Sequence, residues 1–341
     1  MKPIHYLVAF ITLSHMAMAA ARVGVPLYAI HMKATPAVVG ILVGLFAIVP
    51  TLASVPIGRM VDRVGTSKPL VVFLVLMIIG MVVPAVWPDV LAPLYAAGLL
   101  VGGGYFALFI VNTALGGYYG KPEERSSNFA RISLGFAAAN GIGPLLAGFS
   151  IDHAGYRASF LLLSLLPLAA LGMHLAGWLP QRGPALVKQG GAKRSVMELW
   201  RNPRIRPVYV ISIYFMLLWD IFMVMTPIYG AELNISASEI GIIIATFSAA
   251  SFIVRVFVVP LSRRFSPMQL LLISQGLGAA AMLSFGFAGT TPLLIGASFA
   301  LGMGQGLGGP MVTTALYDAS PPERVSEASG LRMSVGMACQ A

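Results

Sequence analysis

The segment PIGRMVDRVGTSKP, residues 56–69, places a cluster of charges between two long apolar runs. Arg59, Asp62, Arg63 and Lys68 are crowded around two glycines in this stretch. Charged side chains are costly inside a lipid bilayer, so a short charged segment between apolar runs is typical of a loop at the membrane surface. The segment therefore predicts a tight turn between two membrane-spanning helices.

The rest of the chain agrees with this interpretation. Of its 341 residues 57% are hydrophobic and only 10% are charged, and the mean hydropathy is +0.84. Ten apolar runs are each near or above the ~20 residues that cross a bilayer as a helix, and they lack the alternation of a membrane β-barrel. The runs are 4–30, 37–58, 69–88, 90–115, 131–151, 157–179, 206–230, 239–262, 268–288 and 291–316. The sequence predicts an all-α polytopic membrane protein.

The two ends of the chain need separate interpretation. The first run could be a cleaved signal peptide, but it continues as far as Ile30, which favours a retained helix. An eleventh span begins near Ser326 and is cut short at Ala341. We therefore expect a C-terminal truncation of about 40 residues, a length that follows from the internal repeat described below.

The net charge of +10 follows the membrane topology and does not indicate nucleic-acid binding. If the N-terminus is cytoplasmic, threading ten spans puts 18 of the 22 Lys and Arg residues on the cytoplasmic side. That asymmetry is the positive-inside rule. It predicts a multi-pass protein of the cell (inner) membrane. The longest polar stretch, residues 180–205, is then a basic cytoplasmic linker.

The halves on either side of the linker repeat each other at an offset of 201 residues. The matches keep one register through helices and polar loops, which chance similarity between apolar segments would not do. The matched pairs are 26–29 with 227–230, 40–46 with 241–247, Arg63 with Arg264, 112–115 with 313–316 and 131–135 with 332–336. A parallel repeat of this kind predicts two six-helix bundles. The predicted domains are 1–180, a linker at 181–205, and a C-terminal bundle at 206–341.

Two motifs resemble signatures of the major facilitator superfamily. Gly58-x-x-x-Asp62-Arg63-x-Gly65, followed by Lys68, resembles the family's motif between spans 2 and 3. That motif implies a contact that controls conformation. Gly143-Pro144, with Gly148 further along, resembles the motif of the family's antiporters. The resemblance implies a twelve-helix transporter of the efflux type.

One departure from the family concerns span 4. Where many family antiporters carry an Arg commonly linked to proton coupling, this chain has Gly98. Proton antiport is therefore not carried over from the family, although protons stay a candidate coupling ion. Gly98 and Gly102 instead predict close helix packing, as do the pairs Gly302/Gly306 and Gly304/Gly308.

Charged residues inside the membrane are the first candidates for a transport site, because they are costly and usually functional. Arg22 lies within span 1 and Asp220 within span 7. The 201-residue offset projects Asp220 onto position 19, which shares a helical face with His15 and Arg22. The resemblance implies that spans 1, 4, 7 and 10 line a central cavity, so we expect Arg22 and Asp220 to face each other. A structural ion pair, or an arginine reaching outward, is the alternative.

Other polar residues on these helices complete the predicted site. They are Tyr105 and Asn112 on span 4, and Gln305 and Thr313 on span 10. Packing without a role in binding is the alternative for each.

Together these features predict a secondary transporter that moves a small organic solute by alternating access. We expect it to export the solute, as an efflux antiporter for a drug, sugar or metabolite. Uptake of an organic anion through Arg22 is the alternative, and a membrane-embedded sensor or enzyme is a remote one. The sequence has a lone Cys339 and no motif for a metal or nucleotide. We expect no catalytic residues and no cofactor. The expected partners are the lipid bilayer and the solute, and we expect a monomer.

Overall fold

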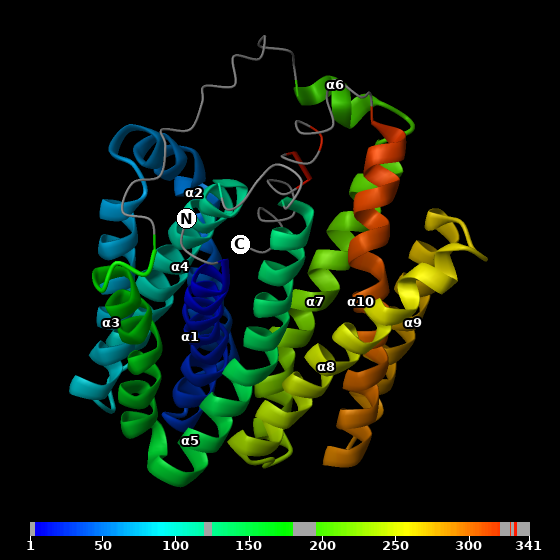
Figure 1. Cartoon of the computed structure of the whole chain (residues 1–341). Coiled ribbons are helices and arrows are strands. Elements are labelled where there is room, and N and C mark those ends of the chain that lie inside the picture. Colours follow the sequence, from blue (N-terminus) through cyan, green and yellow to red (C-terminus); the bar gives the residue numbers. More distant parts are fainter. Residues whose placement is uncertain (1–3, 119–124, 180–195, 321–327, 329–330, 333–341) are drawn as a thin grey trace. The chain divides into compact units, whose positions relative to one another are not determined.

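The computed structural model describes residues 4–118, 125–179, 196–320, 328 and 331–332. In this part of the chain there are ten helices (Figure 1). They are α1 Ile4–His31, α2 Pro36–Val64, α3 Ser67–Val86, α4 Ala92–Tyr118, α5 Arg125–Leu175, α6 Val196–Arg201, α7 Arg206–Glu232, α8 Ala237–Ser262, α9 Pro267–Phe287 and α10 Thr291–Ala319.

All the described helices except α6 coincide with predicted apolar runs, and α6 lies in the segment predicted as a linker. Helix α5 contains two of those runs and breaks at Gly155, where φ is 75° and ψ is 168°. Seven described helices are long and apolar enough to cross a membrane, and Pro36–Val49 is a shorter apolar helix. Most of the predicted eleventh span lies outside the described residues.

The internal repeat is visible in the helix boundaries. Adding 201 to the bounds of α1 gives 205–232, against 206–232 for α7. The same shift gives 237–265 for α2, 268–287 for α3 and 293–319 for α4, and these values match α8, α9 and α10 within three residues. The two halves therefore use their apolar and polar segments in the same order and at the same lengths.

The turns repeat as well. Lys33 and Asn234, 201 residues apart, both have positive φ, at 58° and 56°. Each follows a helix whose end is closed by a backbone hydrogen bond, from Ala34 N–H to the carbonyl of Ala29 and from Ile235 N–H to the carbonyl of Gly230. A left-handed residue with this hydrogen bond is the usual helix C-terminal motif. The repeat is thus conserved in local backbone geometry.

By contact the chain divides into two compact units. Unit 1 is Met1–Val187 with Pro227–Ala245, and unit 2 is Lys188–Thr226 with Thr246–Ala341. Unit 1 therefore contains the end of α7 and the beginning of α8, which the sequence repeat assigns to the second half. The predicted domain boundaries stay a prediction.

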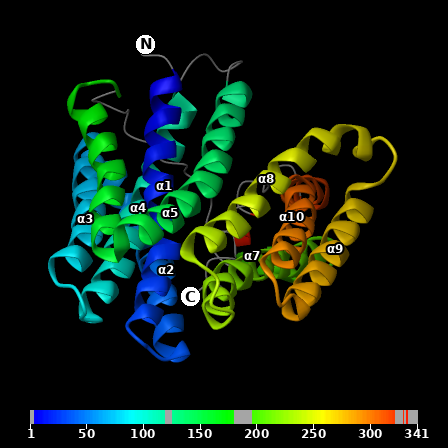
Figure 2. The ribbon, with the colours of Figure 1, turned by 90° about the horizontal axis from the view of Figure 1, so that it is seen from below.

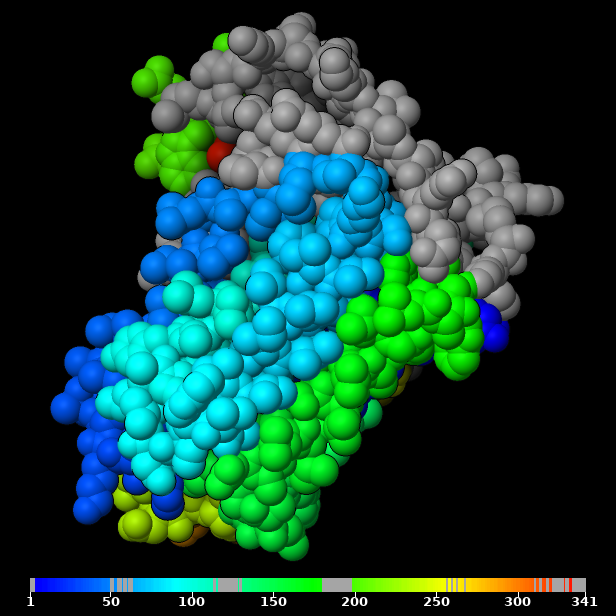
Figure 3. Space-filling view, turned by 90° about the vertical axis from the view of Figure 1, so that its left-hand side faces the viewer, coloured from blue at the N-terminus to red at the C-terminus, as the bar shows by residue number. Residues whose placement is uncertain are grey.

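In unit 1, α1 packs against α5 and α4, and α4 packs against α2 and α3 (Figure 2). Figure 3 shows α3 beside the second part of α5 on one face of this unit. Exposed aliphatic side chains on these two helices suit a lipid-facing surface. They are Val72, Val75, Ile79, Leu161, Leu162, Leu165 and Leu168.

The glycine pair on α4 lies against α2, as predicted. A Cβ built on Gly102 would come within 2.6 Å of the Phe46 backbone, and one on Gly98 within 3.0 Å of the Leu42 carbonyl oxygen. Only a residue without a side chain allows these two backbones to come so close. The close-packing interpretation of these glycines is confirmed.

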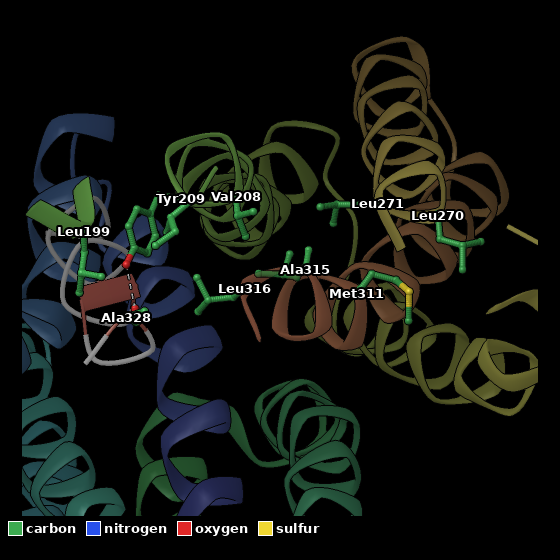
Figure 4. Packing of buried hydrophobic residues seen from close by; sticks show 11 residues of the cluster. Leu199, Val208, Tyr209, Leu270, Leu271, Met311, Ala315, Leu316 and Ala328 are labelled. Atoms are coloured by element: carbon green, nitrogen blue, oxygen red, sulfur yellow. Dashed lines mark hydrogen bonds between the residues drawn. The ribbon is translucent and has the colours of Figure 1, made fainter. Parts of the chain in front are cut away.

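In unit 2, a buried apolar cluster joins α6, α7, α9 and α10 (Figure 4). Tyr209 of α7 is at its edge, where its hydroxyl donates to the carbonyl of Ala328 at 3.2 Å. Trp200 of α6 stacks on the same ring, with centroids 5.7 Å apart. The short helix α6 is therefore held to the start of α7 by aromatic packing.

Candidate functional site

Three polar side chains from three helices meet inside unit 1. His15 of α1 contacts the Tyr105 hydroxyl of α4 through Nδ1, and its Nε2 lies 3.0 Å from Oδ1 of Asn140 on α5. Phe136 packs edge-on against the imidazole, with centroids 5.1 Å apart. The three polar residues are half-buried. A hydrogen-bonded cluster of this kind between apolar spans is a candidate functional site.

The sequence predicted His15 and Tyr105 but missed Asn140. Asn140 interrupts the apolar run 131–151 as its one side-chain amide, and that interruption was the available signal. Arg22 lies seven residues after His15, two turns along α1, and its charge acts on the imidazole. It too is half-buried.

The other predicted residues lie on α4, α7 and α10. Asn112 of α4 is 2% exposed, and its side-chain oxygen has no hydrogen-bond partner in the described part of unit 1. Asp220 of α7 is buried in unit 2. Gln305 of α10 donates from Nε2 to the Phe215 carbonyl at 3.2 Å. Thr313 is on α10, but its side chain lies outside the described residues.

The charged segment that follows the second apolar run forms the predicted turn. Gly65 has φ 79° between α2 and α3, a conformation that favours glycine. Lys68 is exposed in the first turn of α3. The surroundings of Gly58 and the side chains of Asp62 and Arg63 lie outside the described residues, so the conformational role of these residues stays a prediction.

The glycines of the antiporter-like motif bring α5 against two helices. A Cβ on Gly143 would lie 2.8 Å from the Met16 carbonyl oxygen of α1, and one on Gly148 would collide with the Ala237 carbonyl of α8. From the other side, a Cβ on Gly241 would lie 2.6 Å from the Pro144 carbonyl oxygen. The motif therefore forms a tight seam between α5 and α8, all within unit 1.

Asp152, on α5, caps the N-terminus of α8 at one end of this seam. Its carboxylate accepts hydrogen bonds from the backbone N–H of Ala237 at 3.1 Å and of Ser238 at 2.7 Å. Ser236 and Glu239 add a local capping box, each side chain bonding to the other's backbone N–H. The first amides of α8 are thus satisfied from two sources, and a negative charge faces the positive end of the helix.

The Asp152 carboxylate lies between the two predicted spans of α5. Partial burial opposes its ionisation, but hydrogen bonds from Ser238 and Ala237 outweigh this effect and hold the pKa of Asp152 below its usual value of 3.8. A lowered pKa stabilises the folded state above the usual value, and this contribution is lost as the pH falls through the lowered one. The cap should therefore be unaffected between pH 8 and about pH 5.

We expect Asp152→Ala to reduce the free energy of unfolding by about 1 kcal/mol, the typical cost of losing a helix N-cap. Thermal unfolding in detergent would measure the loss. His153→Ala is the matched control, because His153 is exposed and bonds only to the Phe149 carbonyl of its own helix among the described residues. Equal stability of the two variants at neutral pH would contradict the capping role.

The sequence matches the family model of the Major Facilitator Superfamily over residues 7–341. The chain belongs to this family. Membership agrees with the all-helical fold and with the internal repeat, and it makes the chain a multi-pass membrane transporter and not an enzyme. No curated protein sequence matches the chain.

Solved structures of other superfamily transporters share the fold. A bacterial homologue of the human lysosomal transporter Spinster, inward-facing and occupied, aligns at TM-score 0.76 and 14% identity, over 99% of this chain and 80% of that one. The nucleoside transporter NupG aligns at 0.79 and 14%, over 99% and 89%. A peptide transporter POT in complex with sulfate aligns at 0.77 and 16%, over 99% and 86%. At these identities the likeness supports the fold and does not identify a substrate.

Proposed function

We propose that this Major Facilitator Superfamily chain is a secondary active transporter that exports a small organic solute as an antiporter. The observation that carries the proposal is the cluster of His15, Tyr105 and Asn140 between the apolar helices of unit 1. The superfamily fold supports transport by alternating access, in which two bundles rock about a central site. Export is supported by the seam that Gly148 makes with α8, because it is built from the antiporter-like motif.

In this proposal the seam belongs to the outer end of the protein. Opening of the seam would release solute to the outside. Closure of the seam would seal the site while solute enters from the cytoplasmic side. The lowered pKa of Asp152 keeps the cap charged at physiological pH, so the seam would close equally well on either side of neutrality.

Uptake of an organic anion is the second candidate. It is favoured by the position of Arg22 two turns from His15 on α1, because Arg stays charged and binds carboxylates well. The two candidates differ in the charge of the transported solute and in the direction of transport.

Counterflow in proteoliposomes would test both candidates. Purified protein would be reconstituted with one unlabelled solute inside, and uptake of the labelled solute would be followed for sugars, cationic drugs and carboxylates. We expect exchange of one solute class well above protein-free liposomes. Exchange of carboxylates alone would favour the anion carrier, and exchange of none of these classes would contradict the proposed function.

A further inference from the structure

We propose that the turn between α8 and α9 binds the headgroup of an anionic phospholipid. Arg263 and Arg264 would hold the lipid phosphate, and Phe265 would lie beside the start of the acyl chains. The proposal goes beyond the proposed function and applies equally to export and to uptake. It starts from the position of the two arginines, which are adjacent and exposed in a turn that joins two apolar helices (Figure 1).

The internal repeat does not account for this pair of charges. Under the 201-residue offset Arg263 takes the place of Asp62 in the first half. Its neighbour Arg264 is the counterpart of Arg63. The adjacent pair thus changes from opposite charges in the first turn to two positive charges in the second. Two neighbouring positive charges repel each other, and an anion held by both relieves that repulsion.

The backbone of the turn is fixed by local hydrogen bonds. The Leu261 carbonyl accepts from the N–H groups of Arg264 and Phe265, each at 3.0 Å. Ser266 and Gln269 then form a capping box at the start of α9. Because the backbone is held from both sides, little conformational entropy is lost there when a ligand binds the arginines.

The two guanidinium groups are available to a ligand. Within the described part of unit 2, neither side chain takes part in a hydrogen bond or an ion pair. The acidic side chains described in this unit are Glu198, on α6, and Asp220, which is buried within α7. A guanidinium group matches the oxygens of a phosphate and can donate two parallel hydrogen bonds to it. An anionic headgroup is therefore the complementary partner of this turn.

Exposed apolar side chains beside the arginines favour a lipid over a free phosphate. Phe265 and Met268 are each 39% exposed, and Leu272 is 59% exposed. Met268 and Leu272 are four residues apart and share one face of α9. Apolar side chains next to cations at the end of a membrane-spanning helix suit the boundary between headgroups and acyl chains. A free phosphate would leave these apolar side chains in water.

A second basic turn lies at the same end of unit 2 and lacks the apolar component. Leu199 of α6 and Leu270 of α9 belong to the buried cluster drawn in Figure 4, which places the α6–α7 and α8–α9 turns at one end of the unit. Arg201 and Arg204 are exposed in the α6–α7 turn. No large apolar side chain is exposed between residues 198 and 209. This turn therefore offers equal charge without apolar surface beside it, which makes it a matched control.

Titration of dioleoylphosphatidylglycerol into the purified full chain would test the site. Binding would be followed by native mass spectrometry in a nonionic detergent, with zwitterionic dioleoylphosphatidylcholine as the comparison. We expect the anionic lipid to bind at least about tenfold more tightly. Arg263→Gln with Arg264→Gln should raise the dissociation constant of the anionic lipid by about tenfold or more. Arg263→Lys with Arg264→Lys should keep it within about threefold, because both charges remain.

Two further variants separate a defined site from general attraction to positive charge. Arg201→Gln with Arg204→Gln removes the same charge from the same end and should change the dissociation constant by less than about threefold. Phe265→Ser keeps both arginines and should still weaken lipid binding by about threefold or more. The arginine variants should unfold at the temperature of the unaltered protein in detergent alone, because they alter exposed side chains.

Equal losses for the two arginine-to-glutamine pairs would overturn the proposal, because they would show diffuse attraction. Equal affinity for the two lipids would overturn it as well. Inorganic phosphate at about a hundredfold excess should not displace the lipid, since phosphate has no acyl chains to bury. Displacement would indicate a site for a free anion instead of a lipid. None of these measurements uses transport, so a negative result would leave the proposed function untouched.

Discussion

Replacement of Arg22 by Gln is expected to reduce transport by about 100-fold or more. A factor of 100 in rate corresponds to about 2.8 kcal/mol. A charge in the membrane interior costs at least about this much free energy, so the loss of one charged group can account for the effect. Asp220→Asn should have a comparable effect. Arg22 is half-buried in α1 and Asp220 is buried in α7, so neither is an ordinary surface charge. Initial rates of solute exchange in proteoliposomes would measure both losses.

The double variant would test whether the two charges act as a pair. If they do, Arg22→Gln with Asp220→Asn should lose much less than the sum of the single losses, because each single variant leaves one unmatched charge and the double variant leaves none. Arg204→Gln, at an exposed position before α7, is the control and should transport normally. Strict additivity of the two losses would show that Arg22 and Asp220 act separately.

Gly148→Ala is expected to destabilise the protein by about 1–3 kcal/mol, the usual cost of overpacking a tight contact. Its new methyl group would collide with the Ala237 carbonyl, and backbone cannot move aside as a flexible side chain can. Export should fall as well, because the seam between α5 and α8 could no longer close. Thermal unfolding and solute exchange would measure the two effects.

Gly172→Ala is a matched control for this prediction. Gly172 lies in the same helix, and a Cβ built there would meet nothing within 4 Å. Alanine is a better helix former than glycine, so the control should be neutral or slightly stabilising. Equal unfolding temperatures for Gly148→Ala and Gly172→Ala would contradict the tight seam.

Much of the fold was predictable because the bilayer fixes the length of each apolar run. The ten predicted runs fall on the described helices, and the 201-residue repeat was readable from Pro26 to Gly336 because its loops kept register. The turn at Gly65 and the packing of Gly98 were also predictable, because each depends on the absence of a side chain.

The candidate site was only partly predictable, because its members are distant in sequence. Asn140 lies 125 residues from His15, and periodicity within one helix does not show which residue on another helix it meets. The cap that Asp152 places on α8 was missed for the same reason, since its partners are 85 and 86 residues away. The pairing of Arg22 with Asp220 stays a prediction.

The double cap on α8 has a consequence for how quickly the seam could open. Ser236 and Glu239 are neighbours of the helix in sequence and would travel with it, whereas Asp152 would stay with α5. Separation of α5 from α8 would therefore expose only the backbone amides of Ala237 and Ser238 to water. The first turn of α8 would keep the capping box formed by Ser236 and Glu239. Opening would be a rigid-body displacement on the microsecond-to-millisecond scale and would require no refolding of the helix end.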